Sequence, residues 1–127
     1  MKKLKRDPVK YIRDRAKSKY EKKSACEICE ATDQLDFHHF YTLAPLLREW
    51  LKQKQKERPE HYVDEYIVIW RDEFIEDKWA ELYEHTATLC HKHHLELHRL
   101  YGRNPALVTA RKQMRWVEIQ REKHGLV

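Results

Sequence analysis

Five potential metal ligands fall within the nine residues from 90 to 98, and no other stretch constrains the fold as strongly. The segment reads Cys-His-Lys-His-His-Leu-Glu-Leu-His, with one cysteine and four histidines. Imidazole nitrogens need hydrogen-bonding partners when they are buried, so a hydrophobic core gains nothing from such a run. On a helix, His94 and His98 stand four residues apart and leave from the same face. The segment therefore predicts metal ligands carried by a helix.

A cysteine pair far upstream completes a second set of ligands. Cys26 and Cys29 have the C-x-x-C spacing, and Cys90 and His93 have the C-x-x-H spacing of half a zinc knuckle. A lone C-x-x-C pair also fits a redox site, but the second half of the set favours zinc. We expect a closed, structural Zn²⁺ site that joins residues about 60 apart in the chain.

The stretch from Leu35 to Phe40 is the second informative segment, because its aromatic content and alternation indicate a short strand. Neighbouring strand residues point to opposite faces, so His38 and His39 do not both bind one metal ion. We interpret His38 as facing a catalytic metal ion and His39 as directed at a reacting water. The alternative is an ordinary strand with one buried and one exposed histidine.

The rest of the chain is basic and short enough for one domain. It has 127 residues, a net charge of +5 and 37% charged residues, which favours a polyanionic partner over a small apolar ligand. With only two glycines and four prolines, helix should dominate. No apolar run suits a transmembrane helix, and the basic N-terminus lacks the apolar stretch of a secretory signal. We therefore expect no membrane association and a cytoplasmic location, where cysteines bind metal more often than they form disulfides.

Helices are predicted on both sides of the metal-binding segments. Residues 1–24 should form a basic helix, since apolar residues recur in it at helical spacing. This helix is either a solvated element docked by its apolar stripe or an arm that contacts phosphates. A short strand over 86–89 should lead into Cys90, and a helix from His91 to Tyr101 should end at Gly102.

The long segment 42–84 is also predicted to be helical. A helix over 42–57 should end before Arg58, and Pro59 should open the next helix. The acidic stretch 60–84 carries a helical apolar stripe, although Tyr66 to Trp70 also fits a short strand. Its negative charge should face away from DNA.

Three pieces of the chain together resemble the HNH (ββα-metal) endonucleases of the zinc-knuckle type, including small phage-encoded ones. They are C-x-x-C, then L-D-F-H-H, then L-C-x-x-H-H-x-x-x-H. The resemblance spans about Cys26 to His98 and implies a two-stranded hairpin and a helix that hold one divalent ion. It implies that His38, His94 and His98 bind this ion, similar to the arrangement in the colicin nucleases, and that His39 is the general base.

The resemblance also places structural zinc on Cys26, Cys29 and Cys90, with His93 where the family usually has a fourth cysteine; histidine is an equally sound zinc ligand. The middle Asn of the family is replaced by His85, which either braces the hairpin, touches the metal or does neither. The segment between the hairpin strands is about 45 residues long, far more than is usual in the family.

The predicted fold class is therefore α+β and mostly helical, with a ββα-metal core, a long helical insertion between the hairpin strands and flanking helices. We expect a single domain over residues 1–127. Its parts are a basic N-terminal helix (1–24), the zinc-knuckle core (25–101), the helical insertion (42–84) and a basic C-terminal helix (105–124).

The expected function is metal-dependent hydrolysis of DNA phosphodiester bonds. A divalent ion offsets charge at the phosphate, and a neutral histidine, with an ordinary pKa of about 6.5, can deprotonate water at neutral pH. Imidazole ligation suits Zn²⁺, Ni²⁺, Mn²⁺ or Co²⁺, and Mg²⁺ is also considered, so the ion stays open. The resemblance further implies 5′-phosphate and 3′-hydroxyl products. The basic ends should contact DNA phosphates without reading sequence.

Two other functions compete with this one. A zinc protease of the H-E-x-x-H type is excluded because Glu96 lies two residues from both His94 and His98, roughly 200° around a helix. A non-catalytic zinc module that binds nucleic acid or serves phage packaging explains the zinc ligands and the basic ends. It leaves the imidazoles of residues 38, 39, 94 and 98 without a role. The oligomeric state stays open, and a phage-encoded enzyme would act in the host cytoplasm.

Overall fold

A computed structural model describes residues 8–126, with only the backbone described at Pro8, Val9, Val63 and Asp64. Helices alternate with two short strands, so the predicted α+β, mostly helical class is confirmed. The elements are α1 (Pro8–Lys17), β1 (Leu35–His39), α2 (Leu43–Glu57), α3 (Val63–Asp77), the π-helical turn η1 (Ala80–Glu84), β2 (Thr86–Cys90), α4 (His91–Tyr101), the 3-10 turn η2 (Leu107–Thr109) and α5 (Ala110–Lys123).

The two strands pair in antiparallel register, with Leu35 opposite Cys90 and His39 opposite Thr86. Residues 40–85 separate them in sequence, so the pair is a hairpin opened by a long insertion. Both predicted strands are confirmed. The register brings the N-terminal end of β1 against the last residue before α4, which sets this helix beside the strand that carries His38 and His39.

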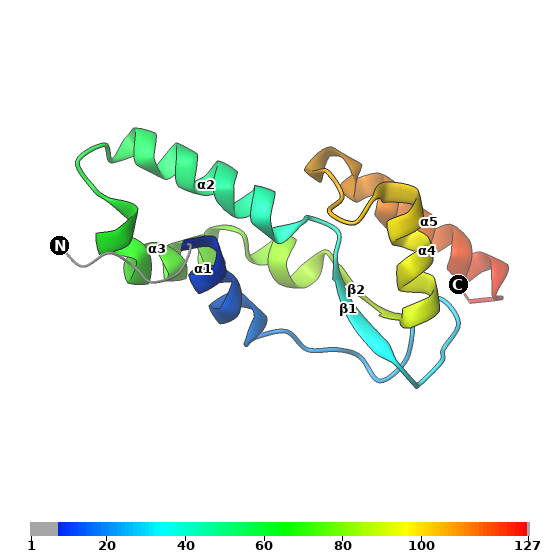
Figure 1. Ribbon diagram of the computed structural model, residues 1–127. Coiled ribbons are helices and arrows are strands. Elements are labelled where there is room, and N and C mark those ends of the chain that lie inside the picture. Colours follow the sequence, from blue (N-terminus) through cyan, green and yellow to red (C-terminus); the bar gives the residue numbers. More distant parts are fainter. Residues whose placement is uncertain (1–7, 127) are drawn as a thin grey trace.

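One hydrophobic core lies among α1, α2, α3 and η1, at one end of the molecule (Figure 1). Apolar side chains recur on one face of each helix, as the sequence pattern predicts. The Trp50 indole of α2 donates a hydrogen bond of 2.9 Å to Asp77 of α3, which joins the two helices of the insertion. The buried residues of this core are Ile12, Ala16, Leu43, Leu46, Leu47, Trp50, Ile67, Trp70, Phe74, Ile75 and Leu82.

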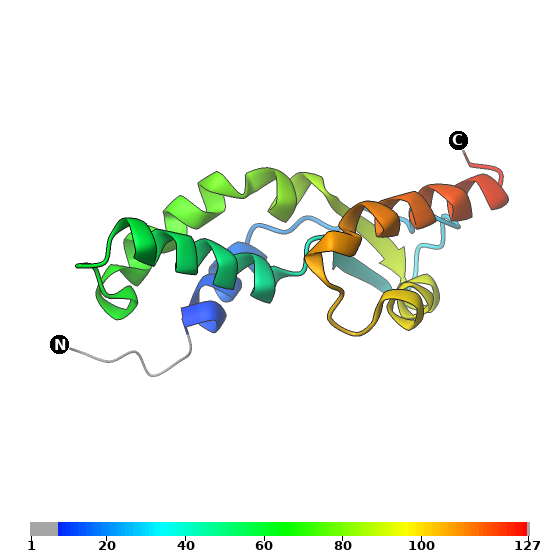
Figure 2. The same cartoon turned by 90° about the horizontal axis from the view of Figure 1, so that it is seen from above.

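A second hydrophobic core lies at the opposite end, under α4 and α5 (Figure 2). It combines the C-x-x-C turn, the two strands and the inner faces of these helices. Tyr41, just after β1, packs against both cores and lies between them. The buried residues of the second core are Cys26, Ile28, Phe40, Ala87, Leu89, Cys90, Leu97, Ala110 and Val117.

Two predicted helix boundaries are wrong. The N-terminal helix ends at Lys17 and not at residue 24, because Ser18 turns its hydroxyl back onto the Arg15 carbonyl at 2.6 Å; residues 1–7 of that prediction lie outside the described part. Pro59 does not open α3, which begins at Val63. It lies in a turn closed by a 3.0 Å hydrogen bond from the His61 amide to the Arg58 carbonyl.

The other predicted elements of the insertion and the C-terminal half are helical as expected. Residues 66–70 belong to α3 and not to a strand, since Ile67, Trp70 and Phe74 are buried together on one helix face. The α4 helix ends at Gly102, whose φ of 92° is the left-handed conformation that favours glycine. Among the described residues, no helix is both long and apolar enough to cross a membrane.

Candidate functional site

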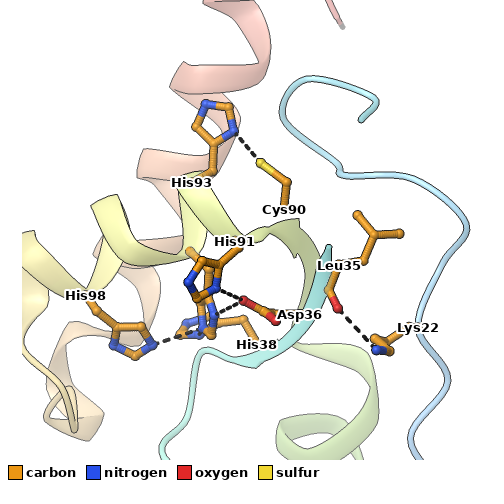
Figure 3. Close-up of polar contacts among 9 residues, drawn as sticks. Lys22, Leu35, Asp36, His38, Cys90, His91, His93 and His98 are labelled. Carbon is orange, nitrogen blue, oxygen red and sulfur yellow. Dashed lines mark hydrogen bonds and ion pairs between the residues drawn. The ribbon is translucent and has the colours of Figure 1, made fainter. Parts of the chain in front are cut away.

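Three cysteines and one histidine gather where the C-x-x-C turn meets the start of α4. The ligand atoms of Cys26, Cys29, Cys90 and His93 all lie within 4.8 Å of one another. The Cys29 and Cys90 sulfurs are 3.8 Å apart, and the Cys90 sulfur lies 3.2 Å from Nδ1 of His93. Figure 3 shows the last two side chains meeting at the first turn of the helix. The four predicted zinc ligands therefore converge.

The spacing of these atoms fits a tetrahedral cation. Zinc–sulfur bonds of about 2.3 Å at tetrahedral angles separate two sulfurs by about 3.8 Å, which is the distance between Cys29 and Cys90. Burial raises the pKa of Cys90 to about 11, so this thiol ionises at neutral pH only when a cation compensates its charge. Soft thiolates with one imidazole are the donors that zinc prefers in structural sites.

A second group consists of three imidazoles, one from β1 and two from α4. The ligand nitrogens of His38, His94 and His98 lie within 4.8 Å of one another. Nε2 of His94 is 3.1 Å from Nδ1 of His38 and 2.9 Å from Nε2 of His98. Strand β1 therefore brings His38 to the helix face that carries the i, i+4 pair, as the sequence predicts.

The far nitrogen of each of these imidazoles meets an oxygen acceptor. Nε2 of His38 donates to Oε1 of Gln113 at 2.8 Å, and Nδ1 of His94 donates to the Asp36 carboxylate at 3.0 Å. Nδ1 of His98 donates to the carbonyl of Gly102 at 2.8 Å. With one proton directed outward on each neutral ring, the three inward nitrogens present lone pairs to one another.

Three converging lone pairs repel one another unless a cation lies between them. Metal–nitrogen bonds of about 2.1 Å place neighbouring ligand atoms roughly 3 Å apart, close to the separations of this cluster. Three protein ligands also leave coordination positions open, which a catalytic ion needs. The residues present therefore fit a divalent cation, with the ring orientation fixed by outer hydrogen bonds.

Asp36 is a functional candidate that the sequence analysis missed. Its carboxylate accepts hydrogen bonds from His94 at 3.0 Å and from His91 at 3.1 Å (Figure 3 labels His91 and Asp36). Burial raises the pKa of Asp36, but these hydrogen bonds outweigh burial and hold it below its usual value. The alternation of β1 offers a signal for this role, since Asp36 shares a strand face with His38.

Both histidines of β1 are kept neutral by burial. Desolvation lowers the pKa of His38 to about 3, against the opposing hydrogen bond to Gln113. Desolvation also lowers the pKa of His39 to about 4, against a hydrogen bond to the backbone of Leu82. Within the described residues Nε2 of His39 has no partner, so Nδ1 makes the bond to Leu82 and Nε2 keeps a free lone pair. A neutral ring with a free lone pair is the form that a general base requires.

His39 faces away from the imidazole cluster, as strand alternation predicts. The ring of Tyr20 packs edge-on against it at 4.3 Å and stacks on Phe37 at 4.5 Å. Both sides of β1 open into one groove of about 740 Å³. The groove is lined by Lys17, Tyr20, Lys22, Leu35, Asp36, Phe37, His39, His91 and His94. One imidazole of the cluster, His94, therefore shares a surface depression with His39 and two lysines.

His85 does not join either group of ligands. Its side chain is exposed, and its ring lies 5.8 Å from that of Tyr41. Its backbone carbonyl accepts a 3.3 Å hydrogen bond from the Phe40 amide, which braces the end of the strand pair. Because a backbone group makes this contact, it does not depend on the imidazole.

A comparison with protein families found a match over most of the chain. The model of the nicking endonuclease family, named for phage T5, matches residues 1–125. No solved structure shows a significant match to the chain. Because the family match covers nearly all of the 127 residues, the chain belongs to the nicking endonuclease family.

Proposed function

We propose that this protein is an HNH-type endonuclease that cuts one strand of DNA by metal-assisted hydrolysis. The observation that carries the proposal is the convergence of three imidazole lone pairs beside a groove that also contains His39. A purely structural histidine cluster does not need, on the other face of the same strand, a neutral histidine whose Nε2 has no partner. Membership of the nicking endonuclease family supports DNA as the substrate.

In this proposal His38, His94 and His98 hold a divalent cation, which supplies charge stabilisation at the scissile phosphate and the leaving oxygen. His39 accepts the proton of the attacking water on Nε2, and its Nδ1 bond to Leu82 keeps the ring oriented. The pKa of His39, lowered to about 4, keeps this base free of protons at neutral pH. Since Nε2 is inaccessible in the free protein, we expect the Tyr20 ring to shift when DNA binds.

The remaining parts of the site have supporting roles. Lys17 and Lys22 line the groove and are exposed, so they are placed to contact phosphates on either side of the cut. The Cys₃His group binds structural zinc and fixes the start of α4, and thereby the ligands that α4 carries. We propose that the chain works as one domain, because Tyr41 packs against both hydrophobic cores.

The number of sites supports single-strand cutting. The described residues contain one cluster of three imidazoles, so each copy of the chain offers one place for hydrolysis. One such centre cuts one strand per encounter, which agrees with the description of the family. The products proposed are a 5′ phosphate and a 3′ hydroxyl.

Cleavage of supercoiled plasmid with a panel of Mg²⁺, Mn²⁺, Co²⁺, Ni²⁺ and Zn²⁺ tests this proposal. We expect open circles to accumulate before linear DNA. His39→Asn should lower the nicking rate by about 10²–10⁴-fold, because a general base contributes that much, while metal content and melting temperature are kept. His61→Asn is the matched control, since His61 stacks on Tyr66 at 3.9 Å within the insertion and should nick like the wild type. Unchanged nicking by His39→Asn overturns the base assignment. DNA binding without cleavage in every ion supports a non-catalytic module.

A further inference from the structure

Gln113 of α5 is a fully buried polar residue. It lies outside the C-x-x-C pair, the histidine strand and the segment 90–98, which are the motifs of the sequence analysis. Its exposed fraction is 0%, and its amide oxygen lies 2.8 Å from Nε2 of His38. We infer that Gln113 is a positioning residue that fixes the tautomer of His38, so that the Nδ1 lone pair of His38 faces the cation site. The inference rests on the proposed metal site, and it assigns to the C-terminal helix a part in building that site.

The orientation of the Gln113 amide is set by groups other than His38. Its nitrogen donates to the Thr109 hydroxyl oxygen at 2.9 Å and to the Phe40 carbonyl at 3.3 Å. The Thr109 hydroxyl donates its own hydrogen bond to the Ala106 carbonyl at 2.6 Å, so it can only accept a hydrogen bond from the Gln113 amide. Two acceptors therefore hold the NH₂ end, and the oxygen end of the amide must face His38.

The tautomer of His38 follows from this orientation. An amide oxygen only accepts hydrogen bonds, so the neutral His38 ring must carry its proton on Nε2. Nδ1 is then left with a lone pair, 3.1 Å from Nε2 of His94. The opposite tautomer would direct an N–H at the cation and leave two buried acceptors, Oε1 and Nε2, facing each other. The chain of hydrogen bonds from Ala106 to His38 thus has one direction throughout.

Gln113→Met tests the inference, because Met is close in size and removes both the acceptor and the donors. Loss of this outer hydrogen bond should weaken Mn²⁺ binding at the imidazole cluster by about 10–100-fold, the usual cost of removing such a partner. Mn²⁺ is the probe, in isothermal titration of zinc-loaded protein, because it discriminates against the thiolate group. Gln120→Met, two turns further along the same helix, is the matched control and should keep the wild-type affinity.

A spectroscopic measurement separates positioning from general support of the fold. In long-range ¹H–¹⁵N spectra of the protein without Mn²⁺, wild-type His38 should show a protonated Nε2 and a bare Nδ1. Gln113→Met should show a mixture of tautomers. Thr109→Val, which removes one of the two acceptors that hold the amide, should shift the affinity in the same direction by a smaller factor. If wild-type His38 carries its proton on Nδ1, or if Gln113→Met binds Mn²⁺ as the wild type does, the inference is overturned.

These readouts do not depend on cleavage. A protein that fails to nick DNA in any ion, yet loses Mn²⁺ affinity on Gln113→Met, refutes the proposed function and leaves the positioning role intact. A protein that nicks in a metal-dependent way, with unchanged affinity in Gln113→Met, refutes the positioning role alone.

Discussion

When no cation occupies the imidazole cluster, acidification should destabilise the protein through the two buried histidines of β1. Burial lowers the pKa of His38 to about 3 and that of His39 to about 4, whereas an imidazole in the unfolded chain titrates near 6.5. At pH 5 each of these two rings therefore carries a proton in the unfolded chain that it lacks in the folded protein. Stability from these groups is complete above pH 6.5 and is lost as the pH falls towards the two folded values.

The magnitude follows from the distance below the unfolded pKa. A pH of 5 lies about 1.5 units below the unfolded pKa of about 6.5. At 1.36 kcal/mol per unit, each histidine therefore costs about 2 kcal/mol of stability when the pH falls from neutral to 5. The two together remove about 4 kcal/mol, which is a large part of the 5–15 kcal/mol that stabilises a typical domain. Urea unfolding at pH 7 and pH 5, followed by the fluorescence of the buried Trp50 and Trp70, measures this loss.

A single substitution separates the two contributions. His39→Asn removes one titrating ring and keeps a side-chain nitrogen at the position of Nδ1, able to donate to the Leu82 backbone. Between pH 7 and pH 5 this variant should lose about 2 kcal/mol less stability than the wild type loses. Equal stability of the wild type at both pH values, or an undiminished loss in His39→Asn, would refute the assignment of these histidines as buried and neutral.

Three further predictions concern the metal groups and the groove. Cys29→Ser should release zinc and lower the melting temperature, because the Cys₃His group joins the C-x-x-C turn to α4; metal analysis and thermal denaturation check this, and a stable zinc-free variant contradicts it. Asp36→Asn should weaken Mn²⁺ binding by about tenfold, because His94 loses a charged acceptor at 3.0 Å. Titration calorimetry measures this affinity, and an unchanged value would contradict the prediction. Lys22→Ala should reduce the salt dependence of DNA binding by about one phosphate contact, measured by fluorescence anisotropy across NaCl concentrations; an unchanged slope argues against this contact.

Spacing alone predicts most of the candidate ligand residues that the structure brings together. The C-x-x-C and C-x-x-H pairs identify Cys26, Cys29, Cys90 and His93, and helical periodicity pairs His94 with His98; the structure brings all of these together as expected. Alternation in a strand likewise predicts that His38 and its neighbour diverge. These features are local, because one turn of helix or one step of strand fixes the relative direction of the side chains.

Residues whose role depends on tertiary packing are not visible in the sequence. Gln113 sits among ordinary helical residues, and only the packing of α5 brings it to His38, 75 positions away in sequence. Tyr20 lies within the predicted N-terminal helix 1–24, yet in the structure it follows the end of α1 and packs edge-on against His39. The start of α3 is missed because Pro59 suits a turn as well as a first helical turn, and the reversal after α2 decides between them.

The strand pair brackets residues 40–85, and this arrangement bears on how quickly the protein folds. Closing a loop of that length costs about 3 kcal/mol of chain entropy before any strand contact is gained. The α2 and α3 helices contact one another locally and can form early, whereas the sheet depends on partners distant in sequence and forms late. Zinc captured by the thiols on both sides of the loop would hold its ends together through that slow step. Zinc supply should therefore control the rate at which folded protein accumulates, in addition to its final stability.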